Sequence, residues 1–251
     1  MSCRNGRRQK SKNKLKLTDS PPVCYILPHM FNRLENNLRE QGKGDFADIV
    51  KILHKLNGAD IPLPRKEGET TFWFSPEQRK GLERKGYLFY PLTGQTIASL
   101  RDAGCQFSST WHEGDSFETL ASRRVEVAIN PKRLFLSKSN EKTLDKQVAM
   151  IAEFGKKIGS EVAGTTAILG SVADYAEVYF AHLVQTEQLL FGKDFDYNST
   201  RTETPTDKSN SVYVGQDYGH YGLNVHYMSQ DDGHTCIWAA PLVVPTAAVG
   251  R

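Results

Sequence analysis

The sequence predicts an α+β protein with an N-terminal helical pair, a mixed α/β middle and a C-terminal antiparallel β-meander. Apolar residues recur at helical spacing in several segments before residue 190. Residues 195–245 instead carry β-branched and aromatic residues separated by turn clusters, which is typical of short strands. With 251 residues the chain is long enough to bury roughly three-quarters of its unfolded surface.

Residues 1–20 are predicted to form a disordered basic arm, because they are polar and charged and lack periodicity. The chain holds 32 Lys+Arg and 29 Asp+Glu, and the first eighteen residues contain seven basic residues and no acidic one. The formal charge of +3 therefore divides into +7 on the arm and −4 on residues 19–251. The seven basic residues are Arg4, Arg7, Arg8, Lys10, Lys12, Lys14 and Lys16.

This division of charge predicts that an anionic partner, such as nucleic acid, would bind the arm. The arm has no aromatic residue to stack on bases, so it would contact phosphates without reading sequence. Two alternatives stay open, namely anionic lipid headgroups as the partner and a solvated tail without a function.

Residues 21–58 are predicted to form a helical hairpin. Two apolar stripes are separated by a break at residues 42–44, and Asn57 and Gly58 end the second helix. The stripes consist of Met30, Phe31, Leu34 and Leu38, and of Phe46, Ile49, Val50, Leu53 and Leu56.

Residues 70–245 are predicted to be one α+β domain that ends in the β-meander. Its first part shows a helix that starts with a Ser75–Gln78 capping box and ends at Gly86. A buried strand over 87–90, a helix capped by Thr93 that stops at Gly104, and strands over 105–107 and 124–129 follow.

The second part of this domain shows a helix over 143–158 that Gly159 would end, and a short strand over 166–169. A long helix capped by Ser171 is predicted from 172 to about 190, with Gly192 as its stop. The meander strands are predicted near 199–204, 211–215, 220–228 and 235–244.

Composition excludes several classes of protein. The four cysteines are far apart and form no C-x-x-C pair, so a disulfide framework and a zinc ribbon are not indicated. No stretch approaches the roughly twenty apolar residues that a membrane helix needs. We therefore expect a cytoplasmic protein without membrane association, and no motif indicates a cofactor.

The loop around Trp111 contains a first candidate for a catalytic site. His112, Glu113 and Asp115 lie close enough in sequence to suggest general acid–base chemistry. Residue 116 is a serine, so the H-E-x-x-H pattern of zinc proteases is absent. The alternative is a polar loop anchored by the tryptophan.

The meander contains a second candidate, a surface that faces a partner through His220, His226, Tyr227 and Trp238. A shared metal is not expected, because His220 and His226 would lie about 20 Å apart along one strand. The sequence thus predicts no metal site. In the alternative, Leu223, Val225 and Tyr227 face the core while Asn224, His226 and Met228 face outward.

Three segments resemble recurring pieces of uncharacterised proteins from small-genome bacteria. They are Gly86 to Gln95, Glu126 to Pro131 and Trp238 to Pro245. The resemblance covers roughly residues 70–245 and implies that they form one unit. It implies no activity, cofactor or catalytic residue.

The leading hypothesis is a non-enzymatic binding or accessory protein whose basic arm contacts anionic partners, with a protein partner possible at the C-terminal sheet. The rival is an enzyme, either a hydrolase or a transferase. Its site would be assembled from dispersed residues, around His112, Glu113 and Asp115 or around His220 and His226.

Overall fold

The structure is a computed structural model that describes residues 72–108, 114–192, 198–206, 209–216 and 222–249. Within these residues the predicted α+β class is confirmed, because helices accompany two four-stranded sheets. The predicted arm over 1–20 and the helical hairpin over 21–58 lie outside the described residues. No helix of the described part is long and apolar enough to cross a membrane.

The first sheet has the strand order β1-β2-β8-β3, and every neighbouring pair is antiparallel. Its strands come from distant parts of the chain. The last of them in sequence, β8, lies between β2 and β3 in the sheet. They are β1 (Leu88–Pro91), β2 (Glu126–Ile129), β3 (Thr165–Ile168) and β8 (Leu242–Pro245).

The second sheet has the order β6-β5-β4-β7. Its first three strands form the predicted antiparallel meander, and β7 pairs with β4 in parallel. The strands are β4 (Ser199–Pro205), β5 (Asn210–Gln216), β6 (Leu223–Ser229) and β7 (Ile237–Trp238).

The single strand expected over 235–244 is wrong, because these residues supply two strands of different sheets. The chain leaves β7 after Trp238 and enters β8 at Leu242. Pro241 lies between them and has no N–H group to donate to a ladder, so a continuous strand cannot run through it.

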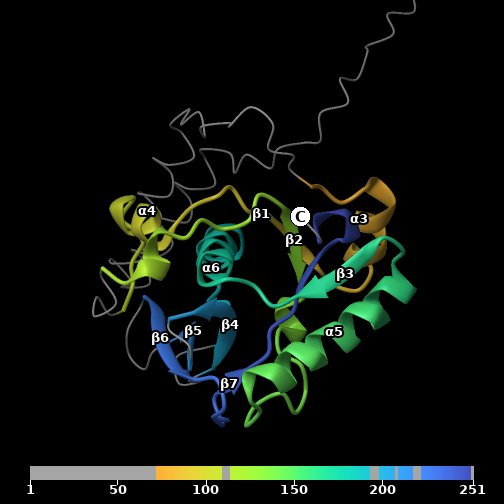
Figure 1. The fold of residues 1–251 in the computed structure, drawn as a ribbon. Helices are drawn as coiled ribbons and strands as arrows, with labels where there is room; N and C mark the ends of the chain where they lie inside the picture. Colours follow the sequence, from red (N-terminus) through yellow and green to blue (C-terminus); the bar gives the residue numbers. More distant parts are fainter. Residues whose placement is uncertain (1–71, 109–113, 193–197, 207–208, 217–221, 250–251) are drawn as a thin grey trace, which may run out of the picture.

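Helix α6 (Val172–Thr186) lies between the two sheets (Figure 1). It contacts β1 of the first sheet and β4, β5 and β6 of the second. Twelve of its fifteen residues are buried, which explains why the helix is apolar on nearly all sides. The main core therefore joins both sheets through α6, with Tyr175, Val178 and Tyr179 at its centre.

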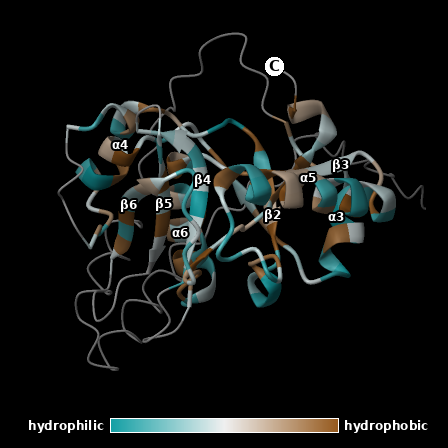
Figure 2. Ribbon diagram, turned by 60° about the horizontal axis from the view of Figure 1, so that its bottom comes forward, coloured by the Kyte–Doolittle hydropathy of each residue, from teal (hydrophilic) through white to brown (hydrophobic). Residues whose placement is uncertain are grey.

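A smaller core lies on the other face of the first sheet, beneath α3 (Pro76–Glu83) and α5 (Leu144–Glu161). Ala128 and Val243 face this core, whereas Val127 and Val244 face α6. Both central strands are thus buried on both faces, and the strand expected over 124–129 forms as β2. Figure 2 shows that the peripheral helices α3, α4 and α5 carry both hydrophilic and hydrophobic residues.

The N-cap residues predicted for the first two described helices are right for α3 and wrong for the next helix, α4. The capping box of α3 forms as predicted, with Ser75 as N-cap and Gln78 as its reciprocal partner. Helix α4 (Ile97–Asp102) is capped by Thr96 instead of Thr93. The strand expected over 105–107 is a single bridge between Phe107 and Leu223.

Helix α5 runs through Gly159, which was expected to end it, and stops at Glu161. A Cβ atom at Gly159 would lie 2.7 Å from the carbonyl oxygen of Thr165, and one at Gly155 would lie 2.9 Å from the amide nitrogen of Ala167. Both glycines therefore serve the close approach of α5 to β3.

Helix α6 begins as predicted, with Ser171 as its N-cap, and the Asp174 side chain completes a capping box. It ends at Thr186, before the stop expected at Gly192, because Glu187 adopts the left-handed conformation with φ 59°. Two acidic residues of its first two turns, Asp174 and Glu177, are buried.

Candidate functional site

The structure describes only part of the predicted acid–base loop. His112 and Glu113 lie outside the described residues. The same is true of His220 in the meander and of all seven basic residues of the arm. Asp115 is exposed and precedes a short 3₁₀ helix (Ser116–Thr119), whose start its side chain does not cap. The described residues therefore do not bring this loop together with another candidate.

His226 lies on the exposed face of the second sheet. Its ring stacks on that of Tyr213 across the β5–β6 pair, with centroids 5.4 Å apart and planes 9° from parallel. Its Nδ1 lies 2.8 Å from the backbone nitrogen of Tyr227, which donates to it. Tyr227 is 41% exposed, although Leu223 and Val225 of the same strand are fully buried.

Trp238 is half-buried, and its indole N–H forms a hydrogen bond within the protein. The indole Nε1 donates to Oδ1 of Asn198 over 3.1 Å, and the ring lies 5.9 Å from that of Phe135. The described part of the chain contains no group of three or more His, Cys, Asp or Glu side chains placed to hold a metal ion.

A cluster that sequence reasoning missed lies beneath the turn 92–96. Glu177 of α6 is 8% exposed and accepts hydrogen bonds from both the backbone nitrogen (2.8 Å) and the hydroxyl of Thr93. Its other oxygen accepts from the hydroxyl of Ser122 over 2.5 Å. One carboxyl group thus fastens two segments of the chain to the central helix.

Asp174 lies one turn before Glu177 and is fully buried. It accepts from the backbone nitrogen of Arg123 over 2.8 Å and forms an ion pair with the guanidinium of that residue. The other side of the same guanidinium pairs with Glu203 of β4. We call the set Thr93, Ser122, Arg123, Asp174 and Glu177 the Glu177 network.

Burial determines the protonation of this network. Loss of hydration raises the pKa of Glu177 to about 7, the nearby charge of Asp174 adds to the rise, and the hydrogen bonds from Ser122 and Thr93 oppose it. Burial, followed by the charge of Glu177, raises the pKa of the Cys105 thiol to about 12. This cysteine is therefore a thiol at neutral pH and is no candidate nucleophile.

His182 is the second buried titratable group of α6, and it contacts the first strand. Its Nδ1 lies 2.6 Å from the hydroxyl oxygen of Tyr90, and its Nε2 lies 3.2 Å from the hydroxyl of Thr186. Burial lowers its pKa to about 4, so the ring is neutral under physiological conditions.

Other buried charges of the described residues also hold the fold together. Glu126 accepts from the backbone nitrogen of Phe74 and pairs with Arg79. Arg201 is fully buried and donates to the carbonyl oxygens of Ser229 and Asp232. Each of these side chains joins segments that are distant in sequence, which is a structural role.

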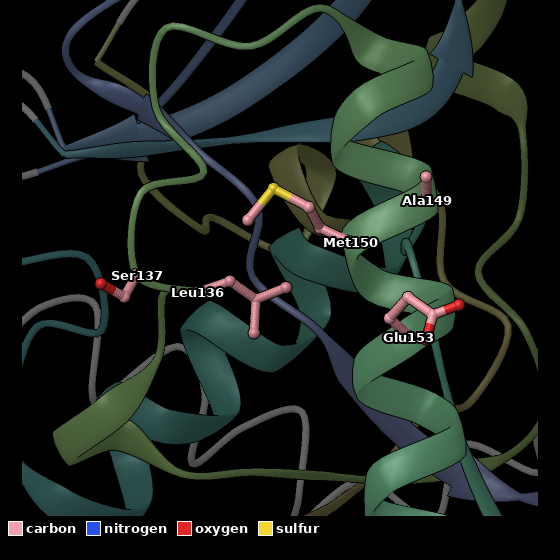
Figure 3. Close-up of a pocket in the computed structure, with 5 residues that line it drawn as sticks. All are labelled: Leu136, Ser137, Ala149, Met150 and Glu153. Atoms are coloured by element: carbon pink, nitrogen blue, oxygen red, sulfur yellow. The ribbon is translucent and has the colours of Figure 1, made fainter.

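A pocket lined by described residues lies elsewhere, between α5 and the segment 136–137, and has a volume of about 420 Å³. Figure 3 shows Met150 of α5 and Leu136 on its two sides. Its single ionisable side chain, Glu153, pairs with Lys156. Three of the five lining residues are apolar. The five lining residues are Leu136, Ser137, Ala149, Met150 and Glu153.

Comparison of the chain with protein-family models, with curated proteins and with solved structures finds no match. The resemblance to proteins of small-genome bacteria therefore stays a prediction. Functional conclusions depend on the residues alone.

Proposed function

We propose that this protein is a non-enzymatic binding protein that contacts nucleic acid through its basic arm. The observation that carries the proposal is the division of charge, with seven basic residues and no acidic residue in the first eighteen positions. Phosphate contacts made by such a segment release counterions, which supplies affinity without sequence recognition.

Three arginines of the folded part support the proposal because they are engaged internally. Arg79 and Arg123 pair with buried carboxylates, and Arg201 is held by backbone carbonyls. The buried acids Glu126, Asp174 and Glu177 likewise bind backbone amides. These groups stabilise the fold, and the proposal gives them no part in phosphate binding.

The test is nucleic-acid binding by the full chain, measured by fluorescence anisotropy of labelled duplex DNA and single-stranded RNA over a range of salt concentrations. For the native chain we expect the logarithm of the association constant to fall with log[salt] on duplex DNA with a slope of roughly −6, about 0.9 for each cation. An arm variant with its seven basic residues changed to glutamine should lose nearly all of this slope. Those residues are Arg4, Arg7, Arg8, Lys10, Lys12, Lys14 and Lys16.

The matched control removes seven positive charges from the folded part, so that both variants have the same net charge. It should retain most of the affinity and of the salt dependence. The changes to glutamine are at Lys132, Arg133, Lys138, Lys142, Lys146, Lys156 and Lys157. Equal losses in the two variants would contradict an arm-borne site. Binding of the native chain to phosphatidylserine vesicles, without binding to either nucleic acid, would replace the proposed partner by a lipid surface.

A further inference from the structure

We propose that the Glu177 network is a proton-dependent switch, in which the protonated carboxyl group keeps the turn 92–96 and the segment 121–124 closed on α6, and ionisation promotes their opening. This inference is independent of the proposed contact with nucleic acid. It concerns a site in the folded part that no binding hypothesis uses.

The site holds more acidic groups than ion pairs. Asp174 and Glu203 share the guanidinium of Arg123, and the charge of Asp174 also acts on Glu177, which has no ion pair among the described residues. Arg123 uses its two ends for Asp174 and Glu203, while Glu177 receives hydrogen bonds from neutral donors. The carboxyl group without an ion pair is the one that most readily holds a proton.

The charge that acts on Glu177 is that of Asp174, one turn earlier on the same helix. Asp174 is in turn paired with Arg123 of the segment 121–124, whose guanidinium also pairs with Glu203 of β4. The guanidinium of Arg124 lies against Gly94, within 3.3 Å of where a Cβ atom would be. The thiol of Cys105, which follows α4, is neutral, and the turn 92–96 has no titratable side chain.

The closed structure also offers the protonated Glu177 a hydrogen-bond acceptor, the hydroxyl of Ser122. Ser122 accepts from the backbone nitrogen of Gly94 over 3.0 Å and has a second acceptor, the carbonyl oxygen of Arg123, at 3.5 Å. When Glu177 is protonated it can donate to the Ser122 hydroxyl, which then turns its own proton to that carbonyl. The donors of Thr93 keep their acceptor on the other oxygen.

Proton linkage gives the direction of the switch. In an open state, with Glu177 hydrated, the carboxyl group titrates near its ordinary pKa of 4.5, whereas in the closed state its pKa is about 7. The open state therefore loses a proton that the closed state keeps, and opening becomes more favourable as pH rises between these values. The equilibrium constant for opening should rise by up to about tenfold per pH unit, or roughly 300-fold in total, and level off above pH 7.

The experiment is amide hydrogen exchange of the full chain between pH 4.5 and 8, with each rate corrected for the pH dependence of intrinsic exchange. Thr93, Gly94 and Arg123 are the reporters, because their amides donate within the network. Their protection should fall toward pH 7 and then stay constant. In Glu177→Gln, which cannot ionise, protection should not vary with pH.

Glu126→Gln is the matched control, because this buried carboxyl group contacts Phe74 and Arg79 outside the network. It should leave the pH dependence at Thr93 and Gly94 unchanged. Constant protection in the native chain, or an unchanged fall in Glu177→Gln, would overturn the proposal.

If Glu177→Gln does not fold, the native chain labelled with ¹³C at its glutamate carboxyl groups replaces it. One buried carboxyl resonance should titrate near pH 7, together with the loss of protection at Thr93. The absence of any glutamate that titrates above pH 6 would equally overturn the switch.

Discussion

His182 and Glu177 lie on the same helix and respond to burial with opposite changes in charge. Each is more stable in its neutral form, so the acid keeps its proton up to about pH 7 and the imidazole loses its proton above about pH 4. In the unfolded chain the acid ionises near 4.5 and the imidazole protonates near 6.5. Between those values the two groups change the free energy of unfolding in opposite directions.

Replacement of His182 should therefore alter the pH dependence of stability. The folded-state pKa of His182 is lowered, so its contribution is present above pH 6.5 and is lost as pH falls toward 4. In His182→Gln this loss should disappear. As pH falls over that interval, the free energy of unfolding of the variant should therefore rise relative to that of the native chain by on the order of 2–3 kcal/mol. Urea unfolding at a series of pH values measures this difference.

Tyr90→Phe is the companion variant, because it removes the hydroxyl that lies 2.6 Å from His182 and keeps the imidazole. We expect it to cost about 1 kcal/mol at pH 7 and to retain the loss of stability in acid. An identical pH profile for His182→Gln and the native chain would show that His182 is not buried as described.

The Glu177 network also shows what residue-level sequence reasoning could reach. Two acidic residues, Asp174 and Glu177, stand out in a helix that is otherwise apolar, and this contrast could have marked them as buried and partnered. The partners of Glu177 could not be predicted, because Thr93 and Ser122 are 84 and 55 residues away in sequence. Hydrogen bonds over such separations follow no spacing rule.

At the scale of elements, the packing of α5 on β3 depends on two glycines. We expect Gly159→Ala to lower stability by about 1–3 kcal/mol, because the added methyl group would lie 2.7 Å from the carbonyl oxygen of Thr165. Helix propensity alone predicts the opposite, a gain of about 1 kcal/mol. Thermal or urea unfolding decides between the two signs.

Ala152→Gly, on the exposed side of the same helix, is the control for propensity. It should cost about 1 kcal/mol without any packing term. A stabilised Gly159→Ala variant would mean that α5 can move away from β3 at little cost.

Elements whose signals are local were predicted well, and those fixed by distant contacts were not. The capping boxes at Ser75 and Ser171 mark the starts of α3 and α6 within a few residues of sequence. Gly159 was misjudged because a glycine that ends a helix and one that permits close packing look alike in sequence. The pairing of β8 with β2 and β3 depends on strands far away along the chain.

At the scale of the whole molecule, α6 gives the two sheets a common core, so they should unfold together. Trp73 precedes the first sheet and Trp238 lies in β7 of the second. We expect variants that keep only one of these tryptophans, with the others changed to phenylalanine, to show the same urea midpoint by fluorescence as by far-UV circular dichroism. Separate midpoints for Trp73 and Trp238 would instead show that each sheet is stable alone.

The position of β8 in the middle of the first sheet also has a consequence for biosynthesis. During translation β2 and β3 leave the ribosome long before residues 242–245, and they cannot hydrogen-bond to each other in the native order without the strand that separates them. Nascent chains arrested before residue 242 should therefore expose both faces of an incomplete sheet to chaperones, and proteolytic resistance should appear only after β8 has emerged.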